Sequence, residues 1–442
     1  MLTLLNLADR QGTAAIAPAV KAELKLTDTQ LGIAMGFGFA IFYTLFGLPI
    51  ARLAERKRRV RILAVAIVTF ALFAGLLAAV RNFGQFLLCR IGVGAGAAGF
   101  GPPSTSLLGD HYPPKKRAAA ITTIWLGGPV GALIGAMGGG WVAQNADWRF
   151  WCIGFAIPTF VVGLLAWFTL REPPRGMSDA TVTTGETPSM IAVARFLLSK
   201  RSMRHVLMGG ALAAIAMNGI GQFLARYLVT GFGIGTARAG QVLGLVGVSG
   251  MASGLALGGF GVGWAAARDE RWYAWGPAIA LLFAAPLMLL GFHQSELGTA
   301  VPLLLAGHVA LFVYFTPTIA LTANMVGADM RASTSYLTSG LVFGLLAIGI
   351  GPTLTGFLSD VFAARAFGGD FTAACPGGIA PAGAAADAAA ACSAASREGI
   401  IGAMGTMSLL FAWAAAHYFL GARRLREDLA RHYGAPEPVT AE

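Results

Sequence analysis

The sequence predicts an all-α polytopic membrane protein with twelve transmembrane helices in two six-helix bundles, and three observations support this fold class. The first is composition: 56% of the 442 residues are hydrophobic, only 12% are charged, and the mean hydropathy is +0.67. A chain this apolar cannot cover a soluble core with a polar surface. The second and third are a series of long apolar runs and a repeat that relates the two halves of the chain.

Twelve apolar runs lie between charged or Pro/Gly-rich breaks, and each is long enough for a helix to cross a hydrocarbon core of ~30 Å. Most of the 32 lysines and arginines fall in alternate connections and in the C-terminal tail. The positive-inside rule therefore predicts a multi-pass protein of the bacterial inner membrane with both termini cytoplasmic. It also explains the net charge of +11 without a nucleic-acid partner. The expected spans are 1–22, 28–53, 60–81, 84–110, 118–143, 149–170, 203–233, 237–266, 273–293, 299–326, 332–362 and 399–421.

These spans divide the chain into two bundles and a linker. We expect an N-terminal six-helix bundle over 1–171, a cytoplasmic linker over 172–202, a C-terminal six-helix bundle over 203–421 and a cytoplasmic tail over 422–442. Apolar residues at 190–200 lie broadly on one side of a helix, which predicts an interfacial amphipathic helix. An extension of span seven is an equally good interpretation.

The two halves repeat at a constant offset, since Pro103 and Pro317 are 317 − 103 = 214 residues apart. A parallel repeat of this kind is typical of transporters whose ligand site lies near the membrane midplane between the halves. The same offset relates Asp110 to Asn324, Arg117 to Arg331, Ala118 to Ala332, Gly47 to Gly261, and Glu55 to Asp269.

An acid and a base lie next to each other inside the first apolar run, at Asp9 and Arg10. Ionisable residues at this depth are costly, and they normally face a bundle interior or a wet cavity on a substrate path or a proton relay. A structural ion pair between helices is the plainer interpretation. Because neighbouring side chains on a helix point about 100° apart, the two charges need separate partners.

Two of the four cysteines, Cys375 and Cys392, bracket an Ala/Gly-rich stretch in the long connection between spans eleven and twelve. The predicted orientation places this connection in an oxidising periplasm. A disulfide is expected there, with two free thiols as the alternative.

Three local motifs resemble those of the major facilitator transporters. Residues 53–59, Leu-Ala-Glu-Arg-Lys-Arg-Arg, are similar to the acid-Arg-x-x-Arg loop of that family, although a plain topogenic basic loop is also consistent. Residues 90–96, Arg-Ile-Gly-Val-Gly-Ala-Gly, resemble the Arg-xxx-Gly-x-Gly element of span four. The run Gly127-Gly128-Pro129 resembles the hinge and close-packing motif of span five. The resemblance implies a conformational latch formed by Glu55, Arg56, Asp110 and Asp269.

Three runs in the first half resemble the spinster subfamily of lysolipid and sphingolipid transporters, which are often proton-coupled. They are Asn6-x-x-Asp9-Arg10, the run from Gly94 to Pro103, and Arg171-Glu172-Pro-Pro-Arg-Gly. Organic-anion symporters of the same superfamily share the first two, so the third is the one that favours spinster. The resemblance at superfamily level extends over the whole chain.

One position departs from the subfamily pattern. Span four normally reads Gly-x-Gly-Glu-Ala-Gly, and this chain has Ala97 where the Glu is expected. The resemblance implies that the acid at this position shares proton handling with Asp9. Ala97 lies two helical turns from Arg90, on nearly the same face. The proton-coupling site is expected at Asp9, with Ala97 marking the family position: either Asp9 couples alone, or Ala97 is an engineered substitution that holds one conformation.

The candidate substrate-binding residues combine cationic and polar side chains within spans. Arginine binds phosphate or carboxylate bidentately, and an acyl chain would lie on apolar walls. Ordinary interhelical hydrogen bonding is the alternative for the polar members. The candidates are Arg10, Arg90, Arg226, Asn218, Gln222, Tyr314 and Tyr336.

The function expected from these features is secondary active transport, by a proton-coupled carrier that moves lysophospholipids or sphingoid-type lipids by alternating access. The alternative is a proton-coupled symporter or exporter of water-soluble organic anions or drugs. A membrane-embedded enzyme or a non-transporting receptor is disfavoured, because the sequence has no nucleophile–base motif, metal-ligand spacing or phosphate loop. No cofactor or metal is expected. The expected partners are an amphipathic anionic substrate, protons and membrane lipids, and the chain is expected to be a monomer.

Overall fold

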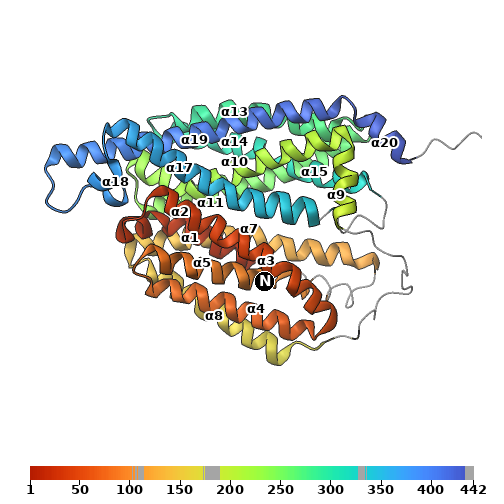
Figure 1. Ribbon diagram of the computed structural model, residues 1–442, viewed down its shortest axis with the longest axis horizontal. Helices are drawn as coiled ribbons and strands as arrows, with labels where there is room; N and C mark the ends of the chain where they lie inside the picture. The colour runs from red at the N-terminus through yellow and green to blue at the C-terminus, as the bar shows by residue number, and fades with distance from the viewer. Residues whose placement is uncertain are drawn as a thin grey trace, which may run out of the picture.

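The structure is a computed structural model that describes residues 1–101, 103, 104, 107, 114–172, 174, 190–326, 334 and 336–433. Over these ranges the chain forms helices and connections and no β-strand, as its composition predicts. Figure 1 shows the helices of the first half (red to yellow) in the lower part of the molecule and those of the second half (green to blue) in the upper part. The expected all-α fold with two helical bundles is confirmed.

The described residues of the first half form seven α-helices and one short 3₁₀ turn, η1 (Leu77–Ala79). Gly36 alone separates the second helix from the third, so these two form one crossing segment. The α-helices are α1 (Leu2–Leu24), α2 (Asp28–Met35), α3 (Phe37–Arg56), α4 (Arg59–Leu76), α5 (Phe83–Ala98), α7 (Pro114–Asn145) and α8 (Arg149–Thr169).

The described residues of the second half include two π-helical segments, η2 (Leu257–Val262) and η3 (Tyr336–Leu346). A 3₁₀ turn, η4 (Pro376–Gly378), lies in the connection before the last long helix. The α-helices are α9 (Met190–Ser199), α10 (Arg201–Phe232), α11 (Thr236–Ala256), α12 (Gly263–Ala266), α13 (Trp272–Phe292), α14 (Leu297–Phe312), α15 (Phe315–Asn324), α17 (Ala347–Phe367), α18 (Phe371–Ala374), α19 (Ala386–Ala422) and α20 (Leu425–Tyr433).

Nine helical stretches among the described residues are long and apolar enough to cross a membrane. Helices α1, α5 and α7 lie where the sequence predicts the other three spans. Helix α1 carries the charges of Asp9, Arg10 and Lys21, and α5 is only 16 residues long. The described helices therefore account for all twelve expected spans.

One expected connection differs in the structure. The stretch before span twelve was expected to be a loop up to residue 399, but α19 begins at Ala386 and is 37 residues long. Its first turns are rich in alanine, the residue with the highest helix propensity.

Helix α9 is separate from α10, because the backbone of Lys200 is extended between them. The apolar face of α9 is buried through Val193 and Leu197, four residues apart.

Helix α7 packs closely on α1 through glycines that include the expected motif. A Cβ added to Gly127 would lie 3.4 Å from the Cβ of Leu4, and one added to Gly128 would lie 3.0 Å from Leu7 Cδ1. One turn further on, a Cβ on Gly131 would meet the backbone carbonyl of Leu4. Small residues allow this approach where no hydrophobic force drives helices together. Pro129 lies inside α7 in the same segment.

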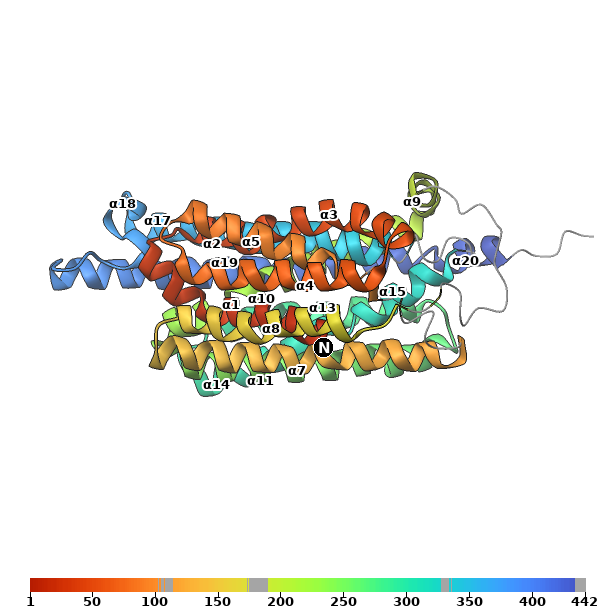
Figure 2. The ribbon, with the colours of Figure 1, turned by 90° about the horizontal axis from the view of Figure 1, so that it is seen from below.

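The two halves meet at the end of the molecule that carries the α1–α2 connection, residues 25–27, and the long α17–α19 connection. We call this the closed end. There α7 packs against α11, and α2 packs against α17 (Figure 1). Figure 2 shows these two contacts on opposite sides of the bundle. Glycines bring the backbones together, since a Cβ on Gly32 would meet the carbonyl of Pro352 and one on Gly140 would lie 3.0 Å from the Cα of Gly240.

Glu172, from the Arg-Glu-Pro-Pro run, caps the N-terminus of α4. Its carboxylate accepts hydrogen bonds from the backbone N–H of Arg59 at 3.1 Å and of Val60 at 2.9 Å, and from Arg59 Nε at 2.9 Å. The first N–H groups of a helix have no partner within the helix and favour a negative charge. Partial burial raises the pKa of Glu172, but these donors outweigh it, so the pKa lies below its ordinary value.

Replacing Glu172 by glutamine is expected to lower the free energy of unfolding by about 1–2 kcal/mol at neutral pH, because a charged cap is lost. The difference between the variant and the parent should shrink as the pH falls below about 4.3, the ordinary pKa of Glu, and through the lowered folded value. Thermal unfolding in detergent against pH measures this. Glu296→Gln is the matched control, because Glu296 precedes α14 without a side-chain cap hydrogen bond. Equal melting temperatures for the two variants would contradict the capping role.

Candidate functional site

Asp9 and Arg90 form a buried ion pair between α1 and α5. Arg90 Nη1 donates a hydrogen bond to Asp9 Oδ2 at 3.1 Å, and the two residues are 2% and 3% exposed respectively. The ring of Phe39, from α3, lies 5.5 Å from the Arg90 guanidinium, within the range of a cation–π contact. A charged pair inside the first bundle is costly unless both members are satisfied, so this contact joins the first and fourth spans tightly.

Arg10 points instead toward the second bundle. Its Nη2 donates to Asn218 Oδ1 on α10 at 3.0 Å, while Asn218 Nδ2 donates to the carbonyl of Ala214 and is held in that orientation. The guanidinium also lies 5.9 Å from the centre of the Phe39 ring. Consecutive residues of α1 therefore contact different halves, as their separation around the helix requires.

Ala97 lies in the apolar interior of the first bundle. It is 1% exposed and belongs to a cluster of buried hydrophobic residues that includes Phe70, Val93 and Phe100. The neighbouring Gly96 packs closely on α4, since a Cβ added there would lie 2.5 Å from the backbone nitrogen of Phe70.

The remaining substrate candidates lie in the second half. Gln222 and Tyr314 are buried in the second bundle, where Tyr314 packs edge-on against Phe315 and Phe343. The Tyr314 hydroxyl is buried without a hydrogen-bond partner among the described residues. Tyr336 begins η3, and its side chain lies outside the described part of the chain.

Arg226 lies in a second cluster of buried charges, at the closed end. Its Nε is 2.7 Å from Asp28 Oδ1, and Lys21 Nζ is 2.7 Å from the same oxygen. Ser359 on α17 donates to Asp28 Oδ2 at 2.7 Å. The Asp28 carboxylate is thus shared by α1, α10 and α17. The guanidinium of Arg226, a candidate for substrate binding, is therefore engaged in this cluster and not at the Arg10–Asn218 contact.

Asp360, one residue further along α17, binds the start of α2. It accepts hydrogen bonds from the backbone N–H of Asp28 at 3.0 Å and of Thr29 at 2.7 Å, and from the Thr29 hydroxyl at 2.6 Å. An acid from the second half therefore caps a helix of the first half.

Sequence reasoning missed Lys21, Asp28 and Asp360. Charges at the ends of spans are common at a membrane surface, so these three residues did not stand out. The usable signal was Arg226, a cation in the middle of a span that needs a buried acid as its partner.

The expected latch is described only in part. Helix α3 ends at Arg56, but the side chains of Glu55 and Arg56 and the whole of Asp110 lie outside the described residues. Asp269 is paired within the second half, accepting from Arg271 Nη2 at 3.1 Å and lying 2.9 Å from Arg426 Nη2 on α20. Hydrogen bonds from Arg271 and the charge of Arg426 hold the pKa of Asp269 below its ordinary value.

Cys375 and Cys392 form the expected disulfide, with their Cα atoms 5.6 Å apart. It closes the connection between α17 and α19. Cys89 and Cys152 are free and buried.

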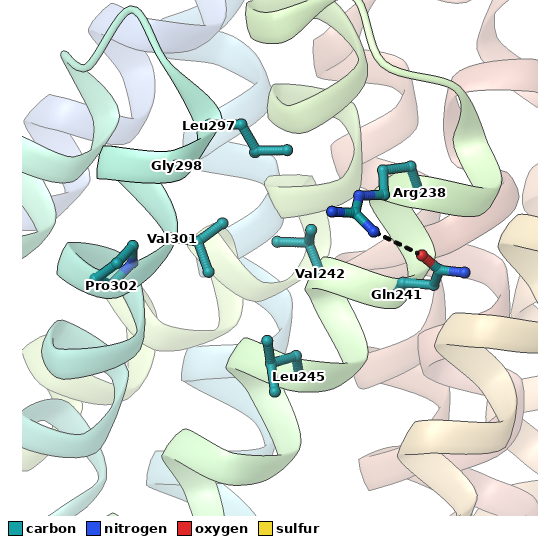
Figure 3. A pocket seen from close by; sticks show the side chains of 8 residues that line it. All are labelled: Arg238, Gln241, Val242, Leu245, Leu297, Gly298, Val301 and Pro302. Carbon is teal, nitrogen blue, oxygen red and sulfur yellow. Dashed lines mark hydrogen bonds between the residues drawn. The ribbon is translucent and has the colours of Figure 1, made fainter.

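A crevice of about 340 Å³ lies between α11 and α14 (Figure 3). Apolar side chains, among them Val242, Leu245 and Val301, line its floor, and Arg238 is hydrogen-bonded to Gln241 at one rim. None of the buried charges described above contributes to its walls.

Two helical bundles with ion pairs buried within and between them define the transporter class of membrane protein. The family model of the Major Facilitator Superfamily matches residues 1–352, and the chain belongs to this superfamily. It is a membrane transporter and not an enzyme.

Relatives place the chain near the spinster branch and also near anion carriers. The solved structure of a bacterial homologue of the human lysosomal transporter Spinster, inward-facing and unoccupied, is similar at 28% identity and a TM-score of 0.89, covering 99% of this chain and 97% of that one. An MFS-type efflux pump of Mycolicibacterium smegmatis is 28% identical over 80% of this chain and 82% of its own length. A hexuronate transporter of Bacillus subtilis is 26% identical over 80% of this chain and 85% of its own.

Proposed function

We propose that the protein is a proton-coupled secondary transporter that moves lysophospholipids or sphingoid-type lipids by alternating access. The observation that carries this proposal is the pair of contacts made by consecutive residues of α1. Asp9 binds Arg90 within the first half, and Arg10 binds Asn218 in the second half. Protonation of Asp9 removes the charge that holds Arg90, and the neighbouring Arg10 links this change to the other half.

We propose that Arg10 is the cation that receives the anionic head group of the substrate. Asn218 is a neutral partner, so an incoming phosphate can displace it without leaving a buried carboxylate unpaired. The unpartnered Tyr314 hydroxyl is a further polar group for the substrate in the second half. Apolar walls in both bundles suit an acyl chain.

We place the protein in the bacterial inner membrane as a monomer, with both termini cytoplasmic and the closed end outside. The positive-inside rule supports this orientation. The closed end then corresponds to an inward-facing state, and the similar spinster homologue was solved in an inward-facing conformation.

Carriage of small organic anions is the second candidate, and the hexuronate transporter among the relatives favours it. The Arg10–Asn218 contact would accept a carboxylate equally well, because guanidinium groups bind carboxylate and phosphate by the same geometry.

Proteoliposomes with an imposed pH gradient test the proposal when they are offered a labelled lysophospholipid or a labelled hexuronate. We expect lysophospholipid movement that is accelerated by the gradient and abolished by a protonophore. Movement of hexuronate alone would support the second candidate. Lipid movement that is equal with and without the gradient would contradict proton coupling.

Replacing Arg10 by glutamine is expected to raise the KM for the anionic substrate at least tenfold, because the positive charge that contacts Asn218 is lost; tenfold corresponds to about 1.4 kcal/mol. Arg238→Gln is the matched control, since Arg238 is an exposed arginine at the rim of the crevice in Figure 3. Initial-rate uptake against substrate concentration measures the effect. An unchanged KM in Arg10→Gln would remove Arg10 from the substrate site.

A further inference from the structure

Four charged residues from both halves meet at the closed end: Lys21 and Asp28 from the first half, Arg226 and Asp360 from the second. We infer that they form the gate that holds the closed end shut, in which Asp360 of the second half caps α2 of the first half. This inference rests on the alternating-access cycle proposed above, but its test measures the closed end directly and requires no transported substrate.

Arg226 lies against the Asp28 carboxylate only while the halves are together. Lys21 and Arg226 share the Asp28 carboxylate, and all three side chains are nearly inaccessible to solvent. When the halves separate, Asp28 and Lys21 remain with the first half and Arg226 moves away with α10. Buried charges are stable only when paired, so separation requires water to enter and hydrate them. The cluster therefore favours a fully closed or a fully open state over a partly open one.

The start of α2 carries two independent caps. Within the first half, Thr27 Oγ1 accepts from the backbone N–H of Gln30 at 3.1 Å and Gln30 Oε1 accepts from that of Thr27 at 3.0 Å, which is a complete capping box. The second cap is Asp360. Because the capping box stays with α2, the helix remains capped when Asp360 leaves. The Asp360 contact can thus be made and broken in each cycle without unfolding α2.

The disulfide-closed connection covers the cluster from the second half. Ser396 on α19 donates to the carbonyl of Gly378 at 2.6 Å and holds η4 against α1. Gly377 and Gly378 have φ values of 74° and 85°, which favour glycine. A Cβ on Gly378 would lie 3.2 Å from Lys21 Nζ and 3.3 Å from Arg226 Nη2. The loop backbone thus lies directly on the two cations and limits their access to water.

A cysteine at Thr353 reports on opening of this gate. The Thr353 hydroxyl lies 3.2 Å from the carbonyl of Gly32 across the two halves and 3.0 Å from that of Gly349 in its own helix, and the residue is partly buried, so separation of α2 from α17 uncovers it further. Thr353→Cys would be introduced into a chain in which the buried Cys89 and Cys152 are replaced by alanine, with the disulfide left intact. Purified protein in nanodiscs is then labelled with a polar maleimide, which reaches both faces of the disc.

Asp360→Asn is expected to raise the labelling rate at least fivefold, because an amide cannot supply the charge that caps α2. Asp360→Glu should keep most of the protection. Asp370→Asn is the matched control and should label at the parent rate, since Asp370 is an exposed acid that caps only α18. Thr29→Val, which removes one donor and keeps the shape, should give a smaller increase in the same direction. Parent-like labelling in both Asp360→Asn and Thr29→Val would overturn the inference, whatever the outcome of the uptake assays.

Discussion

Replacing Asp9 by asparagine is expected to abolish proton-driven accumulation of substrate, with at least a hundredfold loss in the gradient-dependent rate. Asparagine cannot exchange a proton, and it leaves Arg90 without the carboxylate that it binds at 3.1 Å. Breaking a buried ion pair from one side commonly costs about 3–5 kcal/mol, because the remaining charge is buried and unpaired. Ala97 offers no carboxyl group to replace Asp9, so no neighbouring acid on α5 compensates.

The measurement compares gradient-driven uptake with substrate exchange at equal pH on both sides of the proteoliposome membrane. If Asp9 acts in coupling, exchange should fall much less than accumulation. Asp387→Asn is the control, an exposed acid in the first turn of α19. Equal losses in exchange and accumulation would assign Asp9 a structural role only.

Replacing Asp28 by asparagine is expected to produce the largest loss of stability at the closed end. Lys21 and Arg226 then keep their burial but lose the carboxylate oxygen that lies 2.7 Å from each. With a cost of about 3 kcal/mol for an uncompensated buried charge, the ratio of closed to open molecules should fall about a hundredfold. Maleimide labelling of Thr353→Cys and the melting temperature in detergent both report this change.

A double-mutant cycle distinguishes a direct interaction between Asp28 and Arg226 from a general loss of stability. Asp28→Asn combined with Arg226→Gln should recover part of the loss, because only Lys21 remains without a partner. Asp147→Asn provides an exposed control, since the Asp147 side chain is 47% exposed in its ion pair with Arg149 and such pairs contribute little. Additive losses in the double variant would contradict a direct interaction between Asp28 and Arg226.

The site could be predicted from sequence where burial itself marked a residue as unusual. Asp9 and Arg90 lie inside apolar runs, where a charge needs a partner, and the motif spacing brought the first and fourth spans together. The same reasoning found Arg226 but assigned it to the substrate, because a sequence does not say which of many distant residues lies opposite. Its partner Asp28, and Lys21 on the same carboxylate, lie at span ends, where a charge is not unusual.

The fold was predictable from hydropathy and repeat, but some local features were not. Helix α19 begins early because its first turns are rich in alanine, which has a high helix propensity. The sequence predicts a connection there instead, because the stretch lies between two cysteines. Periodicity predicted helix α9 but left open whether it continues into α10, because the break between them is the extended backbone of a single residue, Lys200. The cap that Glu172 places on α4 depends on a contact between segments more than 110 residues apart, as the pairing of Glu172 with Arg59 shows.

The most direct test of the account is whether the two halves move when Asp9 changes its protonation state. Spin labels at Arg81 and Ser295, on the α4–α5 and α13–α14 connections, place one probe in each half. Pulsed electron spin resonance should give a distance distribution that shifts between acidic and neutral pH in the parent chain and becomes independent of pH in Asp9→Asn. A shift of the same size in both proteins would show that Asp9 is not the switch.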